Sequence, residues 1–354
     1  MKVGIAHHDA AARSALERML VNEFRGDCVF AVSDARALLQ RLPGEKPEIL
    51  LLDVDLQGLP LVELTQRVMK DSPCALLLLE NADSHSMSEI FECLGQGATD
   101  VARLPALGLR RPSAEADDFR QRLTTLMRLS GFGRPAEARP KAPQPLAAVD
   151  SSLRLIVLGA STGGPKALTT VLGGLGDLSS AAVVIVQHLD AHFYQELSEW
   201  LHTSSQLPVV AVKAPLRMKA GHVYLAARPE HLILTDKDRL GFSSAWPELI
   251  CRPSIDVFFK SVAEFKDILC AGALLTGMGR DGAEGLLAMR QAGFLTVAQD
   301  AKTSVIDGMP KAARDLGAAS RVLPLADIGP NLSQWLLGQC PKVTTEPLFF
   351  RESD

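Results

Sequence analysis

The chain has 354 residues, with 37 basic and 41 acidic side chains and a formal net charge of −4. This length predicts two domains, and the balanced charge argues against a nucleic-acid partner or a membrane surface. The six cysteines form no C-x-x-C pair, so we expect neither a disulfide nor a zinc site. No leader sequence or bilayer-spanning apolar run is apparent, so we expect a cytoplasmic protein without membrane insertion.

Residues 1–128 alternate short apolar runs with amphipathic stretches, as successive βα units do. Strands are predicted at Lys2–Ala6, Cys28–Val32, Ile49–Val54, Ala75–Leu79 and Asp100–Leu104, and helices at Ala10–Asn22, Asp34–Leu42, Leu61–Lys70 and His85–Leu94. Strict alternation predicts an α/β fold with a doubly wound parallel sheet. Asp53 lies at the end of the third strand, where such folds bind ligands, although an aspartate there can also be a helix cap.

Two segments of this half resemble a response-regulator receiver domain, which has a flavodoxin-like fold. They are LLDVD around Asp53 and GATDVARLP at Gly97–Pro105. The resemblance covers roughly the first 110 residues and implies that Asp53 is the counterpart of the phosphorylated aspartate.

The other residues of the receiver pattern differ here. Its acidic pair is His7-His8, followed by Asp9, and no hydroxyl residue falls near Leu78–Glu80. Its lysine is replaced by Leu104. Aspartyl phosphorylation needs a hard cation and a neutralising lysine, and imidazole is a poor ligand for Mg²⁺. Three alternatives remain: Asp9 shifts into the pocket, His7 or His8 binds a softer metal, or the histidines are ordinary polar residues, which is the commonest case. We predict a degenerate receiver, regulated by something other than Asp53 phosphorylation.

Residues 129–152 are rich in proline and alanine and have no periodicity, as in GFGRPAEARPKAPQPLAAVD. This composition predicts a semi-extended linker. The domain boundaries we expect are therefore 1–128, the linker 129–152, and a second domain at 153–345.

The second domain begins with a buried strand, Leu155–Leu158, that leads into GASTGGP and a helix at about Pro165–Leu172. A strand, a glycine turn and a helix place Ser161 at the carboxyl edge of a parallel sheet, among backbone N–H groups. The alternative interpretation is a structural or phosphate-cradling turn with a capping serine.

Two further strands end in residues that can act on this serine. Ala181–Val186 is followed by His188, and Leu269–Leu275 is followed by Asp281, with a helix from about Ala283 to Ala292. Serine, histidine and aspartate on one rim are the residue types that acyl transfer uses. Each also has a structural alternative, since a histidine after a strand often only packs and an aspartate in GRDG often only caps a turn.

In this interpretation His188 exchanges the proton of Ser161, and Asp281 orients and stabilises the imidazolium. Backbone N–H groups near Thr162, Gly163 or Met278 bind the oxyanion.

Six ordered segments resemble the catalytic domain of chemotaxis protein-glutamate methylesterases of the CheB type. They are GASTGGP, VQHLDAHF, RPSIDVFF, LTGMGRDGAEGLLAMRQAG, TVAQD and DGMPKAA, within about residues 153–340. The resemblance implies a Rossmann-like parallel sheet and places the family's catalytic residues on Ser161, His188 and Asp281. It places active-site lining on Thr162 and Met278.

The resemblance further implies hydrolysis of γ-glutamyl methyl esters on methyl-accepting chemoreceptors, and deamidation of receptor glutamines, without a metal or organic cofactor. A sensor histidine kinase or another chemosensory protein is the partner expected for the receiver. Arg252, Pro253 and Ser254 lie in a segment expected near the cleft, where Arg252 contacts the receptor or forms a surface salt bridge. The alternatives are a serine hydrolase of another ester or amide, and a non-catalytic interaction protein.

Overall fold

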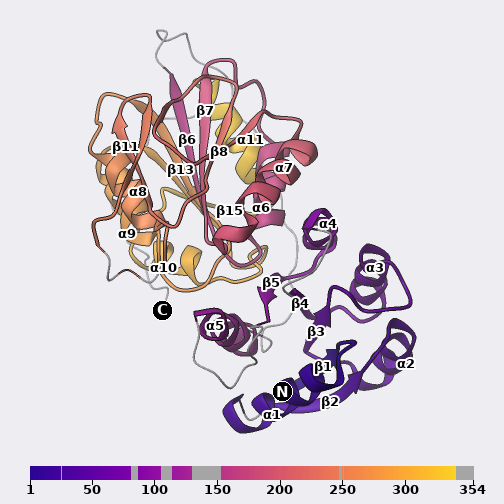
Figure 1. The fold of residues 1–354 in the computed structure, drawn as a ribbon. Helices are drawn as coiled ribbons and strands as arrows, with labels where there is room; N and C mark the ends of the chain where they lie inside the picture. Colours follow the sequence, from indigo (N-terminus) through magenta and orange to yellow (C-terminus); the bar gives the residue numbers. More distant parts are fainter. Residues whose placement is uncertain are drawn as a thin grey trace, which may run out of the picture. The chain divides into compact units, whose positions relative to one another are not determined.

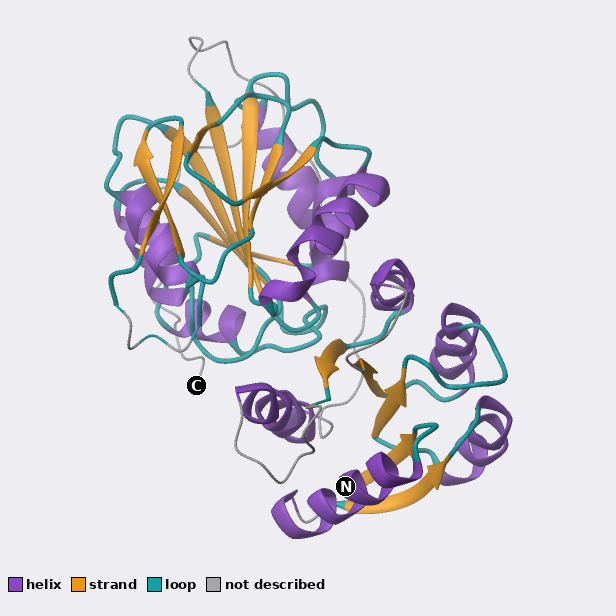
Figure 2. Cartoon of the chain, in the orientation of Figure 1, coloured by secondary structure: helices purple, strands orange, loops and turns teal. Residues whose placement is uncertain are grey.

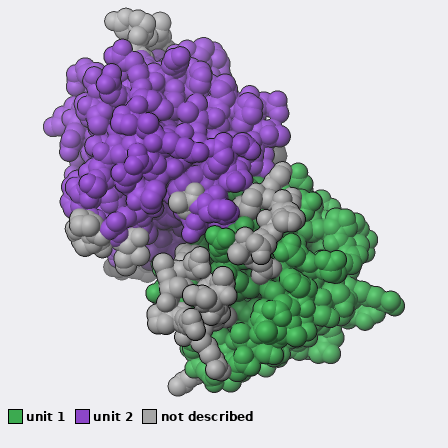
Figure 3. All heavy atoms as spheres, in the orientation of Figure 1, with its two compact units in different colours: residues 1–134 green, residues 135–354 purple. Residues whose placement is uncertain are grey.

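The structure is a computed structural model that describes residues 1–24, 26–80, 87–104, 114–129, 153–246, 249 and 251–339 (Figure 1). The chain divides into two compact units, residues 1–134 and 135–354 (Figure 3). Of the predicted linker, only Leu129 is among the described residues. None of the described helices is both long and apolar enough to cross a membrane.

The first unit is a five-stranded parallel sheet in the order β2-β1-β3-β4-β5, with helices on both faces (Figure 1). Its strands are β1 Lys2–Ala6, β2 Asp27–Val32, β3 Ile49–Asp53, β4 Ala75–Glu80 and β5 Asp100–Arg103. Its helices are α1 Ala10–Phe24, α2 Ala35–Glu45, α3 Leu61–Asp71, α4 Met87–Gln96 and α5 Ala114–Leu129. The order is that of the flavodoxin-like fold, so the predicted architecture is confirmed. Each predicted strand agrees to within one residue at either end.

The second unit is built on a seven-stranded parallel sheet in the order β15-β14-β13-β6-β7-β10-β8. Its strands are β6 Arg154–Ala160, β7 Ala181–Gln187, β8 Val209–Val212, β10 Val223–Ala226, β13 Leu269–Leu274, β14 Leu295–Gln299 and β15 Arg321–Leu323. Its helices are α6 Gly164–Gly173, the short η1 Ala191–Phe193, α7 Tyr194–Ser205, α8 Ile255–Ala263, α9 Ala283–Gln291, α10 Met309–Asp315 and α11 Leu325–Leu336. Helices α6, α7 and α11 cover one face of the sheet and α8 and α9 the other (Figures 1 and 2). The predicted Rossmann-like parallel sheet is confirmed.

A second, three-stranded antiparallel sheet in the order β11-β12-β9 was not predicted from the sequence. It consists of β9 Leu216–Arg217, β11 His231–Asp236 and β12 Arg239–Ser243. These strands are short and only partly buried, so their apolar residues alternate weakly with polar ones. Leu232, Leu234 and Leu240 nevertheless belong to the core of the unit.

The centre of the large sheet positions the candidate site. Strand β6 pairs with β7 on one side and with β13 on the other, and all three run parallel. The chain leaves β6 toward β7 and later returns to the opposite side with β13, so β6 marks a topological switch point. Crevices at the carboxyl ends of such strands are the usual ligand sites of doubly wound sheets.

Candidate active site

The loop after β6 carries Ser161 and is tied to the strands on both sides. The Ser161 N–H donates to the carbonyl of Thr276 at 3.0 Å, just beyond β13. On the β7 side, Gln187 Nε2 donates to the Ser161 carbonyl at 2.8 Å and to that of His188 at 2.9 Å. The backbone of Ser161 is therefore fixed between two neighbouring strands, and the residue is only partly buried.

Glycine is required in the turn that follows the serine. Gly163 has φ +76°, in the left-handed region where residues with a Cβ are strained. A Cβ at Gly163 would also lie 2.7 Å from the Cβ of Val305. The GASTGGP segment thus folds into a tight turn that leads directly into α6.

His188 lies beside Ser161 because the two residues follow paired positions of β6 and β7. Ala160 is the register partner of Gln187, and the His188 N–H donates to the Ala160 carbonyl at 3.0 Å. The ring is held from the other side, where Nε2 of His188 and Oδ2 of Asp281 are 2.8 Å apart. Nδ1 is then the nitrogen left for the serine. In the described part of the chain, no hydrogen bond joins the Ser161 hydroxyl to His188.

Asp281 is anchored by the N-terminal end of α8. Its Oδ1 accepts from the Ser254 hydroxyl at 2.8 Å and from the Asp256 N–H at 3.1 Å. Its Oδ2 accepts from the Ile255 N–H at 2.7 Å and faces His188. Burial alone would raise the pKa of Asp281. The hydrogen bonds that His188 and these donors make to the carboxylate have the larger effect and hold its pKa well below the usual range. The carboxylate is therefore ionised and rigidly oriented.

The His188 imidazole is largely buried, with 14 % of its side chain exposed. Burial lowers its pKa, but the hydrogen bond that His188 donates to Asp281 and the nearby Cys251 outweigh burial and raise the pKa to about 9. The pair thus favours the imidazolium form, the species that a general base produces when it takes a proton.

Two of the predicted oxyanion donors, Thr162 and Gly163, directly follow the serine. The carbonyl of Thr162 accepts from the Thr276 hydroxyl at 3.0 Å, which joins the serine loop to the end of β13. Within the described ranges, the N–H of Gly163 has no hydrogen-bond partner, and Met278 is partly buried on the neighbouring loop. Gly163 therefore offers a donor beside the nucleophile.

In the first unit, Asp53 is fully buried and its carboxylate is already bonded. Oδ2 accepts from the His8 N–H at 2.9 Å and also contacts His8 Nδ1, while Oδ1 accepts from the Asp55 N–H at 3.1 Å. Nδ1 of His7 is 3.4 Å from the same carboxylate. Asp9 is exposed and its Oδ1 accepts from the Ala11 N–H at 2.9 Å, so Asp9 caps α1.

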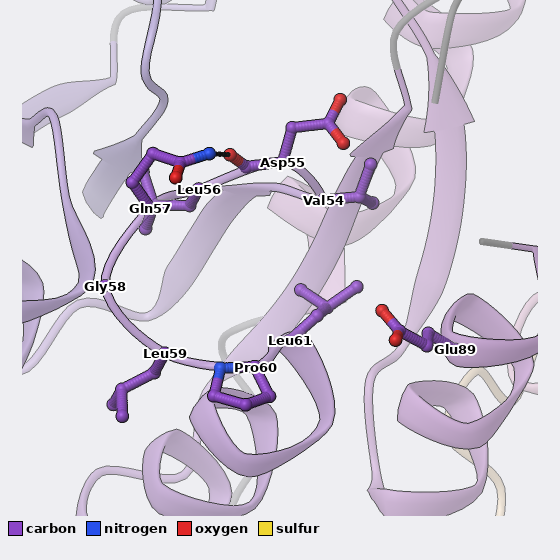
Figure 4. A pocket seen from close by; sticks show the side chains of 9 residues that line it. All are labelled: Val54, Asp55, Leu56, Gln57, Gly58, Leu59, Pro60, Leu61 and Glu89. Carbon is purple, nitrogen blue, oxygen red and sulfur yellow. Dashed lines mark hydrogen bonds between the residues drawn. The ribbon is translucent and has the colours of Figure 1, made fainter. Parts of the chain in front are cut away.

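The loop after Asp53 borders a shallow hollow of about 480 Å³ (Figure 4). It is lined by Val54, Asp55, Leu56, Gln57, Gly58, Leu59, Pro60, Leu61 and Glu89. Gln57 Nε2 donates to the Asp55 carbonyl at 3.1 Å, a local hydrogen bond within this loop. The hollow lies open at the surface and is not a buried pocket.

Comparison with known proteins decides the family. The CheB methylesterase family profile matches residues 156–332. Protein-glutamate methylesterase/protein-glutamine glutaminase 2 of Cupriavidus metallidurans is 40 % identical over 335 residues, covering 94 % of this chain and 97 % of that protein. The corresponding protein 1 of Bordetella avium is 40 % identical over 336 residues, with the same coverage. The chain belongs to the CheB methylesterase family.

Among solved structures, the catalytic domain of Thermotoga maritima CheB methylesterase is 30 % identical and has a TM-score of 0.49. It covers 53 % of this chain and 100 % of that domain. As a member of the CheB family this chain is a carboxylic-ester hydrolase, as its sequence predicted.

Four residues at the CheB site have contacts that the sequence analysis did not predict. Ser254 was expected only near the cleft, yet it donates to Asp281. Asp256 accepts from the Gly285 N–H at 2.7 Å, and burial raises its pKa to about 6. Gln187 holds the serine loop, and the Cys251 sulfur lies within 4.8 Å of a His188 ring nitrogen. The RPSID segment was a signal for two of these, because its serine precedes an amphipathic helix as an N-cap does.

Proposed function

We propose that Ser161, His188 and Asp281 form the catalytic triad of a protein-glutamate methylesterase that acts on methyl-accepting chemoreceptors. The observation that carries this proposal is the 2.8 Å bond between His188 and Asp281, on the rim directly beside Ser161. The names of the relatives include both methylesterase and glutaminase, so we extend the proposal to deamidation of receptor glutamines.

In the first half of the reaction, the Ser161 oxygen attacks the carbonyl carbon of a γ-glutamyl methyl ester. Nδ1 of His188 takes the hydroxyl proton as the new C–O bond forms. When the tetrahedral intermediate collapses, His188 returns this proton to the leaving methoxide, and methanol departs. The product is a glutamyl ester of Ser161.

In the second half, water attacks the glutamyl-enzyme and His188 again takes the proton. The intermediate expels Ser161, which recovers its hydroxyl proton from His188, and the receptor is left with a free γ-carboxylate. Throughout, Asp281 accepts the Nε2–H bond of His188, which fixes the tautomer and stabilises the imidazolium.

The negative oxygen of both intermediates needs donors that are already in place. The N–H of Gly163, supported by the N–H groups of Thr162 and Met278, is our candidate for this role. Oxyanion donors of this kind each contribute roughly a hundredfold or more to the rate.

We further propose that the first unit does not regulate the esterase through phosphorylation of Asp53. The His8 side chain contacts the Asp53 carboxylate, which would itself have to bind a hard cation, and Asp9 caps a helix. A sensor kinase or another chemosensory protein that docks on this unit is the input we favour. Because the five cysteines described are all free, a reducing cytoplasm suits the chain.

The experiment is release of methanol from methylated chemoreceptor membranes by the full chain. Ser161→Ala is expected to lower the rate by at least about a thousandfold. Ser179→Ala is the matched control, because Ser179 is exposed and, among the described residues, bonds within its own turn to Asp177. The rate should be the same with and without a small phosphodonor.

Other results would favour the alternatives. Ser161-dependent hydrolysis of other esters without methanol release from receptors would indicate a different serine hydrolase. A full chain that binds receptors but hydrolyses no ester would indicate an interaction protein. Methanol release that rises several-fold with phosphodonor would contradict the regulatory part of the proposal.

A further inference from the structure

Cys251 places a thiol beside the two catalytic side chains that the mechanism already uses. One ligand atom from each of His188, Cys251 and Asp281 lies within 4.8 Å of the others. The nearby thiol is also one of the groups that raise the pKa of His188. Cys251 takes part in no step of the proposed mechanism, so we considered what else a thiol at this position could bind.

We propose that His188, Cys251 and Asp281 form an inhibitory site for a soft divalent cation such as Zn²⁺. Sulfur, imidazole nitrogen and carboxylate oxygen are the three ligand types that zinc takes in proteins. Three protein ligands leave the fourth tetrahedral position for water. The thiolate makes the site selective for soft cations over Mg²⁺ and Ca²⁺, which prefer oxygen ligands.

The distances suit such an ion after small movements. Zinc bonds of about 2.0 to 2.3 Å place tetrahedral ligands about 3.3 to 3.7 Å apart. His188 Nε2 and Asp281 Oδ2, at 2.8 Å, would separate by about half an ångström, while the sulfur moves inward. Cys251 lies in an irregular segment before α8, and Asp281 is anchored, so the thiol can adjust to a fixed carboxylate.

The site is open enough for a cation to enter. The side chains of His188 and Asp281 are 14 % and 15 % exposed, and Cys251 is partly buried. Binding releases the thiol proton to solvent. The proton between Nε2 and Oδ2 moves to Nδ1 when the imidazole starts neutral, and it leaves to solvent when His188 starts as the imidazolium, which already carries a proton on Nδ1.

Metal binding is incompatible with the general-base role of His188. A neutral imidazole has one lone pair and one N–H, so a nitrogen that binds the metal leaves the other nitrogen carrying the proton. His188 then has no lone pair with which to accept the Ser161 proton. Inhibition therefore follows from occupancy itself, and a chelator reverses it.

This inference rests on the proposed function for its consequence, inhibition, but not for binding of the metal. The experiment therefore has two readouts on the full chain. The first is titration with Co²⁺, in which a thiolate ligand gives a charge-transfer absorption band that nitrogen and oxygen ligands do not give. The second is methanol release in the presence of Zn²⁺ or, as control metal, Mg²⁺, each variant being compared with its own metal-free rate.

We expect the band in the wild-type chain and its loss in Cys251→Ser. Cys28→Ser, which removes a partly buried thiol in the first unit, should keep it. His8→Ala should also keep it, which excludes the second cluster of potential ligands, His7, His8 and Asp53. Zn²⁺ should inhibit Cys251→Ser at least tenfold less strongly than wild type.

Three results would overturn the inference. They are the absence of a band, a band that survives in Cys251→Ser, and a bound metal that leaves an active esterase at full rate. A chain that shows the Cys251-dependent band but releases no methanol would contradict the proposed function while supporting the metal site.

Discussion

A Cβ placed at Gly277 would lie only 2.7 Å from the Cβ of Ser161. Side-chain carbons in proteins essentially never approach this closely, and the sulfur of Met309 blocks the same position. Gly277 also donates its N–H to the Ile306 carbonyl at 3.0 Å, so its backbone cannot simply withdraw. The absence of a side chain at Gly277 thus sets how closely the loop after β13 approaches the nucleophile.

We expect Gly277→Ala to lower kcat/KM for methanol release about a hundredfold, because an ångström-scale displacement of a reacting group costs about that much. Overpacking should also destabilise the second unit by about 1–3 kcal/mol. Gly173→Ala is the control, since a Cβ there meets no atom within 4 Å. Thermal unfolding and methanol release measure the two effects. A Gly277→Ala enzyme with wild-type kcat/KM would show that the loop can shift without displacing Ser161.

Ser254 links catalysis to the stability of α8. Its hydroxyl donates to Asp281 at 2.8 Å and accepts the Val257 N–H at 3.3 Å as the helix N-cap. Ser254→Ala should therefore cost about 1 kcal/mol of stability through the lost cap and lower kcat by roughly tenfold.

A second N-cap provides the control for Ser254→Ala. Asp34 caps α2 by accepting the Ala37 N–H at 2.8 Å, far from Ser161 in the sequence and in the other unit. Asp34→Ala should destabilise its own unit by a similar amount and leave kcat unchanged. Urea unfolding and steady-state kinetics separate the two effects, and equal kcat losses in both variants would argue against a role of Ser254 in orienting Asp281.

The pH dependence of the esterase follows from His188. Its pKa is raised to about 9, and only the neutral imidazole can accept the Ser161 proton, so kcat/KM should rise with pH and level off above about pH 9. Asp281→Asn removes the partner that raises this pKa. We expect the midpoint of the profile to move to lower pH while kcat falls by about 10²- to 10⁴-fold. A flat profile between pH 6 and 9 would contradict the assignment of His188 as base.

The same pair makes stability depend on pH. A pKa that folding raises from 6.5 to about 9 stabilises the folded unit fully below about pH 6.5, by the order of 3 kcal/mol. This contribution is lost as the pH rises through 9. The difference in unfolding free energy between wild type and Asp281→Asn should therefore shrink between pH 6.5 and 9. A difference that stays constant over this range would contradict the raised pKa.

The central strands β6, β7 and β13 of the second unit were predictable because each is a continuous apolar run, whereas β8, β10, β14 and β15 were not located from the sequence. Leu155–Leu158 and Ala181–Val186 are buried on both faces, and such runs have few alternatives to a central strand. The antiparallel sheet of β9, β11 and β12 was not predictable in this way. Its pairing depends on contacts between segments such as Leu216 and Leu240, which are far apart in sequence and weakly patterned.

At the site, the ends of predicted strands identified the three triad residues, but not the residues that contact the triad from irregular segments. Ser161, His188 and Asp281 each follow a recognisable strand, so topology alone places them on one edge. Cys251 follows no strand, and the irregular segment that carries it before α8 has no period. Its approach to His188 is a property of tertiary packing, which single-sequence patterns do not encode.

Asp53 is not expected to accept a phosphoryl group. Because its carboxylate is buried and bonded to His8, the full chain with Mg²⁺ and a small phosphodonor should incorporate no phosphate at Asp53. The triple variant His7→Asp, His8→Asp and Leu104→Lys supplies the oxygen ligands that Mg²⁺ prefers and the neutralising lysine, and it should permit phosphorylation. Intact-mass measurement detects the added phosphoryl group, and adding Asp53→Asn to the triple variant should remove it. Phosphate on the wild-type chain that disappears in Asp53→Ala would show instead that His7 and His8 support phosphorylation.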